Sequence, residues 1–165
     1  MIVRPIVPSD EAAYRSILER TTAEDRYCRF FHMVDHFDPA EVHRFVEDRA
    51  DTTGVIAFDG SEPLGAAHGV SIDETSVELA IVVAHDTRRR GVGRALATAL
   101  IDILTARGFQ RLVAISLREN HSFERLARSV GLRVDRADGD TLHWFLQLNE
   151  TAAPLATSGD ESQPS

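Results

Sequence analysis

The sequence contains no lysine, and all 18 of its basic residues are arginine. A phosphate-binding loop of the Walker type needs a lysine next to its last glycine, so this class of nucleotide site is excluded. Two explanations of the arginine bias stay open. It is typical of a GC-rich genome, and it also fits an enzyme that modifies lysines and carries no targets of its own.

Cysteine, positive charge and long apolar runs are also scarce. The single cysteine, Cys28, cannot form a disulfide within the chain and suits a reducing compartment. The formal net charge of −8 argues against nonspecific binding to nucleic acid. The apolar runs are shorter than a membrane span, and the opening residues show no secretory signal pattern. We expect a cytoplasmic monomer or homodimer without nucleic-acid or membrane partners.

The length of 165 residues fits one folded domain. Periodic apolar patterns extend over residues 1–148. Residues 149–165 are small and polar and include proline, which predicts a disordered C-terminal tail.

Two kinds of periodicity alternate along the domain. Strands are predicted at 2–6, 53–60, 62–73, 75–86, 111–117, 132–137 and 141–148. Helices are predicted after a cap at Ser9 and at 23–32, 39–50, 91–107 and 119–131. The short connections in the middle of the chain favour antiparallel neighbours. We therefore predict an α/β domain with one mixed, mostly antiparallel sheet of about six or seven strands and helices on both faces.

The stretch "TRRRGVGRAL" joins a strongly apolar strand to a helical pattern. Gly91 and Gly93 let a ligand approach the backbone, and the first amides of a helix have no partner within it. Together with the neighbouring arginines they favour a phosphate group. A dinucleotide-binding loop is excluded, because its third glycine is replaced by Leu96.

The order Arg88-x-x-Gly91-x-Gly93 after an apolar strand resembles the signature of the GNAT superfamily of N-acetyltransferases. The resemblance covers about residues 2–148 and implies a GNAT-like fold with acetyl-CoA as co-substrate. It implies that the amides of the loop hold the pyrophosphate, while strand backbone near Val82 and Val83 holds the pantetheine arm. The cofactor-binding residues predicted in this way are Val82, Val83, Arg88, Arg89, Arg90, Gly91, Val92, Gly93, Arg94 and Asn120. No metal site is predicted.

The stretch "ENHSFERLARSVGL" resembles the next conserved helix of the superfamily. Asn120 matches an asparagine that commonly contacts the cofactor, although it also suits a helix N-cap. The tyrosine that often protonates the departing thiolate is replaced by Ala127. Water, another residue or unassisted departure would have to take over that step.

Glu78 is the candidate for the general base that a protonated amine requires. Strand alternation puts it on one face with Ala80 and Val82, where partial burial would raise its pKa. The alternative is a strand-start residue that faces water.

The opening stretches "RPIVPSDEAAYRSIL" and "AEDRYCRFFH" are similar to those of bacterial Pat-type protein lysine acetyltransferases, in which a glutamate at the position of Glu78 is the base. The resemblance implies direct attack by a primary amine, foremost a protein lysine. It also implies an acceptor cleft lined by Tyr27, Arg29, Phe30 and Phe31. A small-molecule amine acetyltransferase and a non-catalytic acyl-CoA-binding module are the alternatives.

Overall fold

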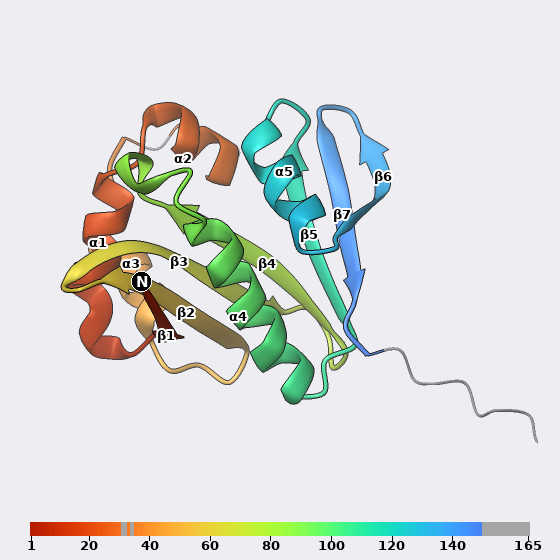
Figure 1. Cartoon of the computed structure of the whole chain (residues 1–165), viewed down its shortest axis with the longest axis horizontal. Helices are drawn as coiled ribbons and strands as arrows, with labels where there is room; N and C mark the ends of the chain where they lie inside the picture. Colours follow the sequence, from red (N-terminus) through yellow and green to blue (C-terminus); the bar gives the residue numbers. More distant parts are fainter. Residues whose placement is uncertain (31–32, 34, 150–165) are drawn as a thin grey trace, which may run out of the picture.

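The computed structural model describes residues 1–30, 33 and 35–149. Within them one seven-stranded sheet has the order β1-β2-β3-β4-β5-β7-β6, with helices on both faces (Figure 1). The strands are β1 (Ile2–Pro5), β2 (Thr52–Asp59), β3 (Glu62–Ser71), β4 (Ser76–Val83), β5 (Arg111–Leu117), β6 (Arg133–Asp138) and β7 (Thr141–Gln147). The helices are α1 (Glu11–Glu19), α2 (Ala23–Phe30), α3 (Pro39–Val46), α4 (Val92–Ala106) and α5 (His121–Ser129), with short 3-10 turns η1 (Pro8–Asp10) and η2 (His85–Thr87).

All neighbouring strands pair antiparallel except β4 and β5, which are parallel. Helix α4 connects these two strands, as a parallel pair requires a crossover. The predicted fold class, a mixed and mostly antiparallel sheet covered on both faces, is confirmed.

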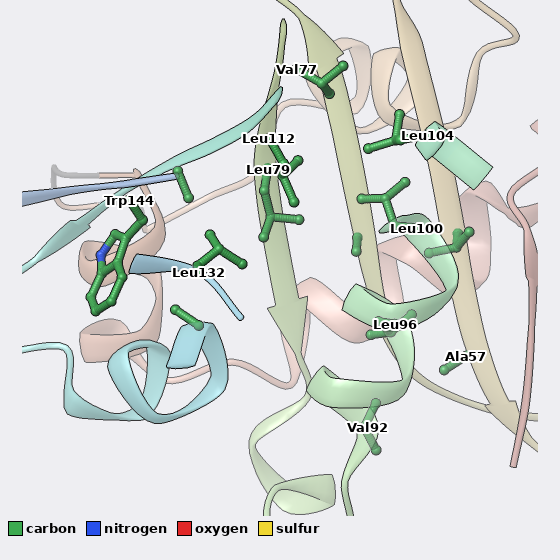
Figure 2. Close-up of a cluster of buried hydrophobic side chains, with 14 of the residues drawn as sticks. Ala57, Val77, Leu79, Val92, Leu96, Leu100, Leu104, Leu112, Leu132 and Trp144 are labelled. Carbon is green, nitrogen blue, oxygen red and sulfur yellow. The ribbon is translucent and has the colours of Figure 1, made fainter. Parts of the chain in front are cut away.

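The hydrophobic core has two parts, one on each face of the sheet. On one face, Leu96, Leu100 and Leu104 of α4 point onto the strands, and Trp144 of β7 lies beside α5 (Figure 2). On the other face, Tyr14 and Ile17 of α1 pack with Val42 of α3. The sheet therefore packs against apolar side chains on both faces.

Three predicted element boundaries are wrong. Ser9 lies inside η1 and does not cap α1, because the carboxylate of Asp10 accepts from Val7 N at 2.9 Å and fixes the turn instead. Helix α3 ends at Val46, since Glu47 already has extended dihedral angles that direct the chain toward β2. Strand β4 ends at Val83, where the chain turns into η2.

Two further predictions reach beyond the described residues. The predicted helix 23–32 includes two positions outside them, and α2 is described as far as Phe30. The disordered tail stays a prediction, because residues 150–165 also lie outside. None of the described helices is long and apolar enough to cross a membrane.

Candidate active site

An opening in the sheet lies between β4 and β5. These strands pair only from Ser76 with Arg111 to Glu78 with Val113, and then separate (Figure 1). Helix α2 contacts both strands. Glu78 is therefore the last residue of β4 that pairs with β5, and it stands where the opening begins.

The backbone of β4 beyond Glu78 has a free side that faces this opening. Ala84 N donates to Leu64 O at 2.9 Å, which turns the polar groups of Ala84 toward β3. Backbone direction alternates along a strand, so Val82 also faces β3, whereas Ile81 and Val83 face the opening. Of the two predicted contacts to the pantetheine arm, Val83 presents its backbone and Val82 does not.

The glycine loop leads directly into the first turn of α4. Arg89 and Gly91 have positive φ angles of 62° and 77°, and Gly91 is the N-cap without a side-chain bond. A Cβ built at Gly91 meets no atom within 4 Å, so open space lies over the exposed backbone. Free first-turn amides, the positive end of the helix dipole and this space together suit a phosphate group.

The arginines of the loop divide into two groups. Arg88 binds Asp25 of α2, whose side chain is 9% exposed and also contacts His85 at 3.3 Å. Arg90 binds Asp59 at 2.6 Å. Among the described residues, Arg89 and Arg94 have no ion-pair partner. We infer that Arg88 and Arg90 fix the loop, while Arg89 and Arg94 are available to an anion.

Asn120 lies at the start of α5 and caps that helix, since its side-chain oxygen accepts from Phe123 N at 3.0 Å. The cap leaves the amide nitrogen of the side chain without a partner in the described part of the chain. Ala127, at the position of the missing tyrosine, is 1% exposed and packs in the core. The methyl group of Ala127 carries no proton that it could give to a departing thiolate.

Glu78 is exposed on the face of the sheet that α1 and α3 cover, so the expected partial burial is wrong. The pairing of β4 with β5 ends at Glu78, and its side chain stays in contact with solvent there. Arg29 of α2 lies within electrostatic reach of Glu78 and Tyr14. Burial lowers the pKa of Arg29, and these two groups act against that shift. Burial also raises the pKa of Tyr14 to about 12.

His68 of β3 is buried on the same face, and its Nε2 pairs with Phe45 O at 2.8 Å. Burial is the main cause that lowers the pKa of His68 to about 4, from 6.5. Between these two pH values the unfolded chain binds the additional proton, so stability falls as the pH drops. At about 1.4 kcal/mol per unit of pKa, the loss approaches about 3 kcal/mol.

Urea unfolding of the wild type at pH 7 and pH 5 should show about 2 kcal/mol of this loss, because pH 5 still lies above the folded-state pKa. His68→Gln is expected to reduce the pH dependence, whereas the exposed His121→Gln control keeps it. Equal pH dependence in wild type and His68→Gln would contradict the assignment.

The described residues hold no group of three or more His, Cys, Asp or Glu side chains placed to bind a metal ion. The features that are present, a glycine loop before a helix and an open strand edge, fit an elongated phosphate-bearing molecule.

Comparison with known families is decisive here, because residues 15–132 match the Acetyltransferase (GNAT) family. The chain belongs to the GNAT family. It is accordingly an N-acetyltransferase that uses acetyl-CoA as co-substrate.

Solved structures share the fold of this GNAT domain. The GNAT domain of S. lividans PAT is 24% identical with a TM-score of 0.83, and the match covers 88% of this chain and 89% of that one. YncA of Salmonella typhimurium, a putative acetyltransferase solved with its cofactor acetyl-CoA, is 22% identical with a TM-score of 0.74, covering 94% and 98%. Ribosomal-protein-alanine N-acetyltransferase from Brucella melitensis is 21% identical with a TM-score of 0.68, covering 89% and 99%.

Proposed function

We propose that this GNAT domain transfers the acetyl group of acetyl-CoA to the side-chain amine of a protein lysine, with Glu78 as the general base. The observation that carries the proposal is the position of Glu78. Its exposed carboxylate stands where β4 and β5 separate, beside the free backbone edge of β4. A base at this point can reach an amine that enters the opening.

The roles of the residues follow from this geometry. Glu78 accepts a proton from the ammonium group, directly or through one water, and the neutral amine attacks the thioester carbonyl. Backbone N–H groups of β4 that face the opening, at Ile81 or Val83, stabilise the negative charge on the carbonyl oxygen. The amides at Gly91 and Gly93, with Arg89 and Arg94, hold the pyrophosphate. The nitrogen of Asn120 that capping leaves unused can donate to the donor molecule.

Three observations support a lysine acceptor. The net charge of −8 suits a cationic partner. The chain has no lysine, so it carries no side-chain target of its own. The fold is similar to the GNAT domain of a protein named PAT.

The function is tested by incubating a lysate with the enzyme and isotope-labelled acetyl-CoA, followed by mass spectrometry. Label on protein lysines above a control without enzyme is expected. Label only on small amines would reject the lysine acceptor, and no enzyme-dependent label at all would reject acetyl transfer.

The proposed pyrophosphate site predicts the effect of Gly91→Ala. Gly91 has left-handed dihedral angles, in which an alanine costs about 1–2 kcal/mol. A change of the backbone that relieves this strain would displace the amides of the first helical turn. The KM for acetyl-CoA is expected to rise about tenfold, the equivalent of about 1.4 kcal/mol of binding.

Gly108→Ala is the matched control, because Gly108 has a φ of 89° at the opposite end of α4 and open space around its Cβ. It should lose similar stability with an unchanged KM for acetyl-CoA. Equal KM values in both variants would remove Gly91 from the site.

A further inference from the structure

The face of the sheet that carries Glu78 also holds a cavity of about 640 Å³. Its wall includes His68 and Val70 of β3 and Phe45 of α3. Val70 and Glu78 are direct partners in the β3–β4 register, and partners in antiparallel strands point to the same face. Val70 therefore lies both in the wall of the cavity and next to Glu78, the proposed base.

The interior of this cavity, which we call the α3 cavity, is mainly apolar and aromatic. Phe30 and Phe37 lie with ring centroids 6.0 Å apart, and Phe45 lies 5.4 Å from His68. The backbone carbonyl of Phe45 is hydrogen-bonded to Nε2 of His68, and burial keeps this histidine neutral. A volume in the range of small-ligand pockets and aromatic walls favour an apolar guest.

Charged groups also line the α3 cavity, and acidic ones exceed basic ones. Arg49 is bound to Asp51 at 3.0 Å and is thus neutralised. Within the described ranges, the other charged wall residues, Asp35, Glu41 and Arg44, form no ion pair. With Glu78 next to the cavity, this arrangement suits a cationic amine attached to an apolar body.

We propose that the α3 cavity receives an apolar group carried next to the acceptor amine, and so selects amines by their apolar neighbour. This inference rests on the proposed function of Glu78 as the base. Two kinds of acceptor carry such an apolar group. One is a peptide with an apolar residue beside the acceptor lysine, and the other is a small arylalkylamine with its ring.

The test compares kcat/KM of the full chain for two matched pairs of acceptors. One pair is two peptides that differ only in phenylalanine or glycine beside the lysine, and the other is phenylethylamine and ethylamine. Burial of the phenyl group should favour the apolar member of at least one pair about tenfold or more. The pair that shows the preference identifies the source.

Val70→Phe narrows the cavity at a position that is 40% exposed, so the fold should tolerate it. The ratio of kcat/KM for the apolar member to kcat/KM for the smaller member should fall to about twofold or less. Val70→Asp leaves the space open but makes the wall charged, and it should lower the same preference. Ile72→Phe is the matched control, since Ile72 is 57% exposed and lies outside the cavity wall.

Transfer without preference in either pair, or an unchanged preference in both Val70 variants, would overturn the role of the cavity and leave acetyl transfer intact. Absence of transfer to every acceptor would reject the proposed function and this inference together.

Discussion

Replacing Glu78 with glutamine is expected to lower kcat/KM for acetyl transfer at pH 7 by about 10²–10⁴-fold, the usual contribution of a positioned general base. Glutamine keeps the size and hydrogen-bonding shape of the side chain but cannot accept the proton. Because Glu78 is exposed, the substitution should leave the free energy of unfolding within about 0.5 kcal/mol of wild type.

The loss of activity in Glu78→Gln should depend on pH. A lysine amine has a pKa of about 10.4, so its neutral fraction grows as the pH rises toward that value. The need for a protein base falls accordingly, and the deficit of Glu78→Gln should shrink in steady-state assays from pH 7 to pH 10.

Glu74→Gln is the control, because Glu74 is another exposed glutamate shortly before β4. It should match wild type throughout. If Glu78→Gln equals wild type at every pH, another group is the base.

The second large effect is expected for Leu100→Ala, at the centre of the contact between α4 and the sheet. Leu100 is completely buried among the leucines that α4 presents to the strands (Figure 2). Deleting a buried leucine side chain costs about 2–5 kcal/mol, since both the transfer energy and the packing of the surroundings are lost. The melting temperature should fall by about 5–15 °C.

Thr98→Ala, on the exposed face of the same helix, should change the free energy of unfolding by less than about 0.5 kcal/mol. Thermal and urea unfolding measure both variants. Because Leu100 lies far along α4 from the glycine loop, Leu100→Ala should keep its KM for acetyl-CoA at temperatures where it is folded. A cost below about 1 kcal/mol would show that the core relaxes around the missing side chain.

Local patterns predicted the elements well where one residue type decides the backbone. Gly91 and Gly108 bound the helical pattern, and the structure places α4 between them. The start of α1 was mispredicted for a tertiary reason. Asp10 is held by Arg4 at 2.7 Å, so a contact with β1 and not a cap at Ser9 fixes the turn.

The sequence by itself was enough to predict the co-substrate of this protein, acetyl-CoA. Glycines that expose backbone, arginines and a following helix are consecutive residues, and their physical effect on an anion depends on local geometry. The same holds for the alternation that puts Glu78 on one face of its strand.

Only the tertiary structure decided which of these groups are available. Arg88 forms an ion pair with Asp25, 63 residues earlier, and Arg90 forms one with Asp59, 31 residues earlier. The pairing of β4 with β3 directs the backbone of Val82 toward β3 and that of Val83 toward the opening, and Glu78 is exposed where the pairing with β5 ends. The cavity beside Glu78 joins residues of β3 and α3. Such pairings depend on how distant segments pack, and no periodicity within one segment encodes them.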